Sequence, residues 1–577
     1  MPSPSNILTT LVALAATASA VTPVVVDGKD FVNSETKERF PIIGVDYQPG
    51  GAGGFSTKKD PLSSPKDCLR DAALMQRLGV NTIRVYNLSP TLNHDECASI
   101  FNAAGIYMIL DVNSPLQGDN LDRTQPWNSY NPGYFEQVFG IIEGFKDYPN
   151  TLAFFSGNEV INEQSAHAVP AYIRAVQRDM KAYISKHATR SIPVGYSAAD
   201  VRNILLDQAN YFQCDIKSTD SRADFFGLNS YSWCGDSDYH ASGYDVLTED
   251  FVNSSFPVIF SEYGCNAVQP RKFSEVQALY GEKMSTAFAG GLVYEYAQEE
   301  NDYGLVVVDS NGDAKLREDF DALREQYSKL DMQRLKEASK AHTDAEPVEC
   351  SSSLITSGEF LDSFELPERL EGVQKLIDNG CGGKGGKIVG FGGRDVTQKI
   401  HGANGEEVSG VSLNVKEDES GKKPATDDKD SDDKDNDNED KDNNEDKDEK
   451  NDEAKHEDKD EDKDDKHSSN DTNTNDDNDS AAETTTQTPQ TTQAPEATTS
   501  SSATQSTITP TPSTHNANTI STPNSSSSSS TIIHATANDA SPSASPTPTY
   551  YTGAGSKPSS SMLFSLLSGV AGLAALL

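Results

Sequence analysis

The 577-residue sequence predicts a (β/α)8 TIM barrel in its first two thirds. Eight short apolar runs follow one another, and segments with helical spacing separate them. This alternation is typical of a parallel sheet with crossover helices, and eight repeats over about 260 residues match the size of such a barrel. Almost every run begins apolar and ends polar, at the rim where barrel enzymes hold their active sites.

The predicted strands are FPIIGVDYQ from Phe40, VNTIRVYN from Val80, IYMILDVN from Ile106, LAFFSGNE from Leu152, IPVGYSA from Ile192, DFFGLNSYSW from Asp224, PVIFSEYG from Pro257 and GLVYEYAQ from Gly291. A helix is predicted between the first two of them. From Leu69 to Leu78 an apolar residue recurs at every third position, which makes one apolar face, and Gly79 then provides a stop.

Residues that can hydrogen-bond or stack on a sugar gather at the strand ends. They are Tyr47, Gln48, Tyr86, Asn87, Asp111, Asn113, Asn158, Glu159, Asp200, Asn229, Tyr231, Trp233, Glu262, Tyr263, Tyr294 and Tyr296. A binding-only barrel can carry the same aromatic side chains, because sugar faces pack on rings in any such groove. Two strand-end carboxylates without basic neighbours in sequence favour an enzyme over a lectin-like protein.

Glu159 and Glu262 end the fourth and seventh runs. If both runs are parallel strands of one barrel, one carboxyl can protonate a leaving oxygen while the other attacks the sugar carbon or activates a water, which is the apparatus of a glycosidase. The alternative is structural, because such glutamates also cap helices or pair with a buried arginine, for which Arg84 is available. Other barrel carboxylates compete with this pair, namely Asp46, Asp111 and Glu295. Spacing alone leaves the two roles interchangeable.

Both ends of the sequence have the pattern of processing signals. Residues 1–20 form an apolar segment with a small-residue end from Ala18 to Ala20, which predicts a secretory signal peptide rather than a buried helix. Residues 553–577 contain small residues, a polar spacer and an apolar tail, the order of a glycosylphosphatidylinositol (GPI) attachment signal, with Gly553 preferred over Gly555 as the site. A transmembrane anchor is the alternative, but it needs about 20 apolar residues.

The composition between these signals divides the chain further. We expect the barrel over residues 21–330, a small and weakly ordered extension over 331–415, an acidic disordered segment over 416–467 and a Ser/Thr/Pro-rich stalk over 468–552. The acidic segment could also buffer divalent cations. A net charge of −41 without a basic patch excludes a nucleic-acid partner.

Seven cysteines in a secreted chain predict disulfide bonds with one cysteine left over, although the sequence alone leaves their connectivity open. A zinc site is the alternative, but the chain has no C-x-x-C pair and few histidines, so we expect no metal. Sequons at Asn87 and Asn253 predict N-glycosylation, although Asn87 lies close to the rim. Further sequons occur at Asn470, Asn478 and Asn524.

The motifs GVDYQPGG, RVYNLSP, LDVNSP, SGNEV, NSYSWCG, SEYGCN and GGLVYEYAQEENDYGLV together resemble the fungal 1,3-beta-glucanosyltransferases of glycoside hydrolase family 72. The resemblance covers roughly residues 22–330. It implies a retaining enzyme that cleaves inside a β-1,3-glucan and joins the new reducing end to the non-reducing end of another chain, with Glu159 as acid/base and Glu262 as nucleophile. The implied glucan-binding residues are Gln48, Tyr86, Asp111, Asn158, Asp200, Tyr231, Tyr294 and Tyr303.

The resemblance also implies disulfide bonds Cys68 with Cys97, Cys214 with Cys350 and Cys234 with Cys265, which leaves Cys381 unexplained. Many relatives carry an arginine where this chain has Leu205, and Arg202 stands nearby instead. Some relatives add a cysteine-rich carbohydrate-binding module, which we expect to be absent here.

From these features we expect a monomeric enzyme of the outer face of the plasma membrane and the cell wall. Its partners would be β-1,3-glucan donor and acceptor chains and, through a GPI lipid, the plasma membrane. No cofactor is expected. An endo-β-1,3-glucanase and a non-catalytic glucan-binding wall protein are the alternatives.

Overall fold

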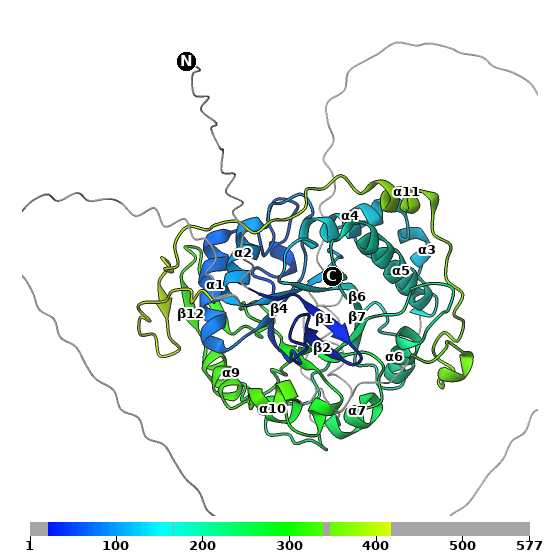
Figure 1. The fold of residues 1–577 in the computed structure, drawn as a ribbon. Helices are drawn as coiled ribbons and strands as arrows, with labels where there is room; N and C mark the ends of the chain where they lie inside the picture. The colour runs from blue at the N-terminus through cyan, green and yellow to red at the C-terminus, as the bar shows by residue number, and fades with distance from the viewer. Residues whose placement is uncertain (1–20, 164–165, 338–346, 417–577) are drawn as a thin grey trace, which may run out of the picture. The chain divides into compact units, whose positions relative to one another are not determined.

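The computed structural model describes residues 21–163, 166–337 and 347–416, which all fall in one compact unit of the chain. Eight parallel strands close into a barrel in the order β10-β3-β4-β5-β6-β7-β8-β9 (Figure 1). The predicted TIM barrel is therefore confirmed. Its strands are β3 (Ile42–Tyr47), β4 (Thr82–Val85), β5 (Tyr107–Asp111), β6 (Thr151–Asn158), β7 (Val194–Ala199), β8 (Phe225–Asn229), β9 (Val258–Tyr263) and β10 (Gly290–Val293).

Helices surround the barrel, and several of them begin with a proline or end at a glycine. They are α1 (Pro65–Leu78), α2 (Asp95–Ala104), α3 (Pro126–Ser129), α4 (Pro132–Phe145), α5 (Val169–His187), α6 (Leu205–Gln213), α7 (Tyr244–Phe251), α8 (Glu275–Leu279), α9 (Glu318–Ser328) and α10 (Met332–Glu337), with short 3-10 turns η1 (Ala52–Gly54) and η3 (Met284–Thr286). Proline stands in the first turn of α1, α4 and α5, where no intrahelical donor is lost. Gly79 and Gly105 end α1 and α2 in the left-handed conformation that glycine adopts freely. The helix predicted up to Gly79 is α1.

A hairpin that the sequence did not reveal closes the N-terminal end of the barrel. Strands β1 (Val24–Asp27) and β2 (Asp30–Asn33) pair antiparallel and cross the middle of the ring of strands in Figure 1. Phe31 is fully buried and meets Phe225 edge to face with ring centroids 5.5 Å apart. The hairpin therefore covers this end of the barrel, opposite the rim at which the strands end.

Three disulfide bonds join the pairs that the family resemblance implies. Cys68–Cys97 links α1 to α2, Cys214–Cys350 links the end of α6 to the extension, and Cys234–Cys265 links the loops that follow β8 and β9. Cys381 is free and half-buried.

The segment after the barrel has more structure than the sequence led us to expect. It runs along the outside of the helices from α6 past α5 and α4 to α1 and α2 (Figure 1), and contains η5 (Ser352–Leu354), α11 (Glu371–Asn379) and β13 (Ile400–His401). Val373 and Ile377 of α11 are buried against α4 and α5, and β13 pairs with β12 (Ala314–Leu316), which also pairs with β11 (Val306–Val308). The glycine-rich sequence conceals this order because the segment is stabilised by contacts with the barrel rather than by a core of its own.

None of the helices in these three described ranges is long and apolar enough to cross a membrane. The predicted signal peptide, acidic segment, stalk and Gly553 lie outside the described residues, as do the sequons after residue 416.

Candidate active site

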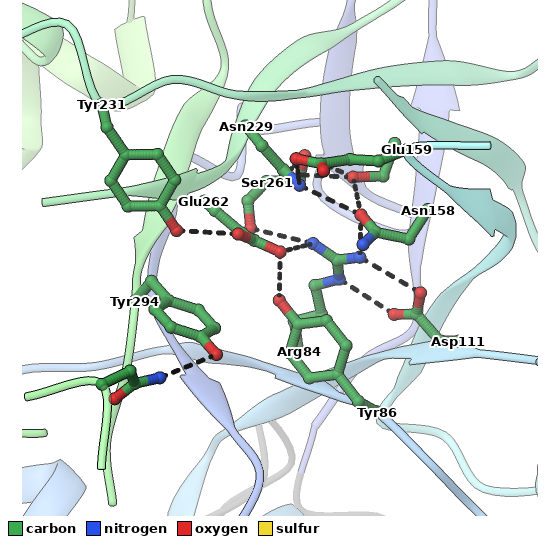
Figure 2. Close-up of polar contacts among 12 residues, drawn as sticks. Arg84, Tyr86, Asp111, Asn158, Glu159, Asn229, Tyr231, Ser261, Glu262 and Tyr294 are labelled. Carbon is green, nitrogen blue, oxygen red and sulfur yellow. Dashed lines mark hydrogen bonds and ion pairs between the residues drawn. The ribbon is translucent and has the colours of Figure 1, made fainter. Parts of the chain in front are cut away.

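Glu159 and Glu262 emerge at the same rim of the barrel, as the strand pattern predicts (Figure 2). Glu262 lies in β9, and Glu159 directly follows β6. Glu159 has a backbone φ of 48°, a left-handed conformation that is uncommon for a residue with a side chain, and its amide donates to the carbonyl of Ser197 at 2.8 Å. Such local strain is concentrated at functional sites, because the surrounding structure must hold it in place.

Both carboxylate oxygens of Glu262 accept hydrogen bonds. The hydroxyl of Tyr231 donates to Oε2 at 2.7 Å, and that of Tyr86 donates to Oε1 at 2.8 Å. Arg84 Nη1 also donates to Oε1, at 3.3 Å. Burial raises the pKa of Glu262 above its usual value, while Arg84 and the two tyrosines oppose that rise. These donors are suited to hold an ionised carboxylate in one orientation.

Arg84 is fully buried at the centre of the site (Figure 2). Its Nε and Nη2 donate to the two oxygens of Asp111 at 2.9 and 3.1 Å, and Nη2 also donates to Asn158 Oδ1 at 2.9 Å. The structural alternative, in which Arg84 only pairs with a strand-end glutamate, accounts for only part of this arrangement. Asp111 takes the bidentate pairing, so Arg84 connects three rim side chains instead.

Glu159 has a different electrostatic environment from Glu262. Burial and then the negative charge of Glu262 raise the pKa of Glu159 to about 7, although a hydrogen bond from Asn229 Nδ2 to Oε1, 2.9 Å long, opposes the rise. Glu159 thus keeps its proton at mildly acidic pH. Two carboxyls whose surroundings push their pKa values apart can act as an acid and an anion side by side.

Buried serines support this site from below, and sequence reasoning missed them. Ser197 Oγ donates to Asn158 Oδ1 at 2.8 Å, and Ser261 Oγ donates to Asn229 Oδ1 at 2.8 Å. Asn229 in turn donates to Asn158 Oδ1 at 3.0 Å. Only their positions inside strands β7 and β9 hint at this role, because a serine facing the barrel interior needs a polar partner.

Three tyrosines form a cluster beside Glu262. The ring centroids of Tyr231 and Tyr303 are 5.6 Å apart, those of Tyr294 and Tyr303 are 5.3 Å apart, and those of Tyr231 and Tyr294 are 6.4 Å apart. All three pairs meet edge to face, an arrangement that aromatic rings favour. We call these residues the tyrosine cluster.

The competing carboxyls have other environments. Asp46 is fully buried, and neither of its oxygens has a hydrogen-bond partner in the described part of the chain. Burial raises the pKa of Asp46 well above its usual value and that of Glu295 to about 8. Glu295 is therefore mostly protonated near pH 7 and unsuited to act as a nucleophile, burial disfavours the charged form of Asp46, and Asp111 is engaged with Arg84.

Two further predicted glucan contacts lie at the rim but outside this network. Asp200 follows β7, accepts a hydrogen bond from Ser230 Oγ at 2.7 Å and pairs with Arg202. Arg202 therefore has a partner on this chain. Gln48 follows β3 and is buried.

The two sequons in the barrel differ in accessibility. Asn253 is exposed, whereas Asn87 is only 2% exposed. The burial of Asn87 disfavours a glycan at that residue in the folded chain, and the exposure of Asn253 favours that sequon.

Comparison with known proteins shows the family to which the chain belongs. A sequence model described as glucanosyltransferase, of glycoside hydrolase family 72, matches residues 13–331. The chain belongs to this glucanosyltransferase family. The chain is 64% identical over 416 residues to the 1,3-beta-glucanosyltransferase gel2 of Aspergillus fumigatus. The alignment covers 72% of this chain and 87% of gel2.

Other glucanosyltransferases are also similar. The probable 1,3-beta-glucanosyltransferase GAS3 of Saccharomyces cerevisiae is 48% identical, with 66% of this chain and 77% of GAS3 covered. The solved structure of Saccharomyces cerevisiae Gas2p in complex with laminaripentaose has a TM-score of 0.55 and 39% identity, covering 61% of this chain and 78% of that chain. A mutant Gas2p was also solved with laminaritetraose and laminaripentaose, with a TM-score of 0.53.

Proposed function

We propose that this glucanosyltransferase cleaves a β-1,3-glucan chain internally and transfers the new reducing end to the non-reducing end of another glucan, with retention of configuration. The observation that carries the proposal is the contrast between Glu262, which accepts from three donors, and Glu159, whose pKa is raised to about 7. The printed names of gel2 and GAS3 and the laminaripentaose in the Gas2p structure support the choice of substrate.

In the first half-reaction Glu262 is the nucleophile. Its carboxylate attacks the anomeric carbon, an ester bond forms, and the glycosidic bond to the departing glucan breaks. Glu159 gives its proton to the leaving oxygen and becomes a carboxylate. Because Glu262 loses its charge in the ester, the main electrostatic cause that raises the pKa of Glu159 after burial also disappears, which favours this proton transfer.

In the second half-reaction Glu159 acts as a base. It removes the proton from the hydroxyl at the non-reducing end of the acceptor, whose oxygen attacks the anomeric carbon as the ester to Glu262 breaks. Both glutamates return to their starting protonation states. A second inversion at the same carbon gives net retention.

Side chains around the pair would bind the sugar. The oxygen of Asn158 already accepts from Arg84, Ser197 and Asn229, which leaves its amide nitrogen to donate to the sugar 2-hydroxyl. The tyrosine cluster presents rings beside Glu262 on which an acceptor glucan can stack, and this raises the chance that sugar reaches the ester before water does. We also include Gln48, Tyr86, Asp111 and Asp200 among the glucan-binding residues.

For the cellular setting we propose secretion after removal of residues 1–20, GPI attachment at Gly553 and N-glycosylation at Asn253, which place a monomeric enzyme at the outer face of the plasma membrane and in the cell wall. The apolar tail, polar spacer and small residues of the C-terminal sequence support the anchor.

Product analysis tests the proposed reaction. The purified protein is incubated with a reduced laminarin oligosaccharide, and the products are separated by length. Products longer than the substrate are expected from the wild type and none from Glu262→Gln. Shorter sugars alone would instead identify an endo-β-1,3-glucanase, and the absence of any new product would favour a glucan-binding wall protein.

A further inference from the structure

Arg271 is a buried arginine, 3% exposed, in the loop between β9 and α8. Its Nε donates to Asp319 Oδ2 at 2.7 Å, and its backbone amide donates to the other oxygen of Asp319 at 3.2 Å. Asp319 itself is 2% exposed and belongs to α9. The ion pair therefore ties the loop after β9 to a helix on the outside of the barrel.

The remaining donors of Arg271 are directed at the backbone of the rim. Nη1 donates to the carbonyl of Gly264 at 3.2 Å and to that of Tyr294 at 2.7 Å, and Nη2 donates to the carbonyl of Tyr303. Gly264 follows β9, whereas Tyr294 and Tyr303 lie in the segment that follows β10. One guanidinium thus ties the loop after β9 to the segment after β10, and that segment carries two members of the tyrosine cluster.

The third member connects this arrangement to the proposed nucleophile. Tyr231 meets the rings of both Tyr294 and Tyr303 edge to face and donates its hydroxyl proton to Glu262 at 2.7 Å. A shift of the Tyr294 or Tyr303 backbone would therefore alter the surface beside Glu262, although Arg271 itself makes no contact with Glu262 among the hydrogen bonds of the described residues.

We infer that Arg271, anchored by Asp319, is a positioning residue that fixes the tyrosine cluster and thereby sets how the ester on Glu262 is divided between an acceptor sugar and water. The inference rests on the proposed function. Its chemical basis is the number of donors, because arginine offers five N–H groups in a planar fork whereas lysine offers three from one nitrogen. Lysine can keep the charge pair with Asp319 but cannot serve three separated carbonyls in the same geometry.

The chain contains a matched control at the other end of the barrel. Arg39 is also buried, donates from Nε to Asp30 Oδ1 at 2.6 Å, and donates to the backbone carbonyls of Ser285 and Phe288, each at 3.0 Å. Arg39 thus combines an ion pair with several carbonyl contacts, as Arg271 does, but it lies beside the hairpin that closes the N-terminal end.

The test compares Arg271→Lys with Arg39→Lys in the full-length protein. For each, the rate of consumption of a reduced laminarin oligosaccharide is measured together with the fraction of product that is longer than the substrate, over a range of acceptor concentrations. Arg271→Lys should lower the transferred fraction by roughly tenfold and raise the acceptor concentration for half-maximal transfer, since misplacement by about 1 Å can cost up to a hundredfold. Total consumption should change far less, and Arg39→Lys should keep the wild-type product ratio.

Melting temperatures separate positioning from simple stabilisation. Both lysine variants should melt below the wild type, so an equal loss of transfer in both would overturn the inference. A wild-type product ratio in Arg271→Lys would overturn it as well.

If Arg271→Lys does not fold, Asp319→Asn replaces it, because this change retains the arginine and weakens its anchor. The same fall in the transferred fraction is expected, and an unchanged product ratio contradicts the inference. A wild type without longer products would instead defeat the proposed function itself.

Discussion

The hydroxyl of Tyr231 lies 2.7 Å from Oε2 of Glu262 and donates a hydrogen bond to it, while the other oxygen of Glu262 accepts from Tyr86 and Arg84. The two oxygens of this carboxylate thus have different partners. Tyr231 also belongs to the tyrosine cluster, so one side chain connects the proposed nucleophile with the proposed acceptor surface.

Removal of that hydroxyl should weaken the nucleophile's orientation and change its titration. In Tyr231→Phe we expect kcat/KM to fall by about 10- to 100-fold, since a hydrogen bond to a charged group contributes about 1.5–3 kcal/mol. Because the Tyr231 hydrogen bond lowers the pKa of Glu262, the acid limb of the pH profile should move to higher pH. Tyr294→Phe is the control for this shift. The Tyr294 hydroxyl contacts Asn301 and not Glu262, so the acid limb of Tyr294→Phe should stay where it is in the wild type. An unshifted acid limb in Tyr231→Phe would contradict the prediction.

The basic limb of kcat/KM should report Glu159. A general acid must be protonated, so activity is expected to decline as pH rises through about 7, the pKa to which burial and Glu262 raise this group. Asn229→Ala removes a hydrogen bond that lowers this pKa, and the basic limb should therefore move to higher pH. Asn113→Ala, at a buried rim asparagine that contacts Ser156 and Tyr134, should not move it.

Isosteric amides at the two glutamates should fail in different steps. Glu159→Gln cannot protonate a leaving oxygen, so turnover of natural glucan should fall by roughly 10²- to 10⁴-fold. With an aryl β-laminarioligosaccharide whose phenolate needs no proton, release of the phenol from Glu159→Gln should stay near the wild-type rate. Glu262→Gln should be inactive on both substrates. Phenol release by Glu262→Gln at the wild-type rate would exclude Glu262 as the nucleophile.

Stability of the folded domain should decrease from pH 5 to pH 8. Burial raises the pKa of Glu295 to about 8 and that of Glu275 to about 7, so the folded state binds more protons than the unfolded state over this interval. Stability from such groups is complete below the unfolded pKa and is lost as pH rises through the folded pKa, on the order of a few kcal/mol for Glu295. Urea unfolding at several pH values measures this. The free energy of unfolding should fall less steeply with pH in Glu295→Gln than in the wild type. In Glu325→Gln, a control at an exposed residue, it should fall as in the wild type.

The extension should contribute to the stability of the barrel. Ile377 of α11 is 3% exposed against the barrel helices, and Ile377→Ala should reduce the free energy of unfolding by about 2–5 kcal/mol. Leu370 precedes α11 and is 39% exposed, so Leu370→Ala should stay within about 0.5 kcal/mol of the wild type. Chemical denaturation measures both, and a neutral Ile377→Ala would mean that the extension is not held against the barrel in solution.

The sequence pattern was sufficient to predict the barrel and its rim, because each strand carries its own signal: an apolar run that ends in polar residues. The positions of Glu159 and Glu262 followed from the parallel direction of β6 and β9. The hairpin over the N-terminal end could not be predicted in this way, since β1 and β2 are four residues each and resemble any short apolar stretch. The extension was underestimated for a related reason: its buried residues are few, and their partners lie on helices more than a hundred residues earlier.

By itself, then, the sequence determined the fold class, the strand ends at which polar residues collect and the family that its motifs resemble, all of which depend on local patterns. Only the tertiary structure decided how burial and neighbouring groups shift the pKa of each rim carboxyl. Glu262 accepts hydrogen bonds from Arg84, Tyr86 and Tyr231, which come from other strands and loops, whereas burial dominates at Asp46 and raises its pKa well above the usual value. A carboxyl's charge depends on its burial and on the groups that surround it in space, and strand register and loop packing bring those groups together.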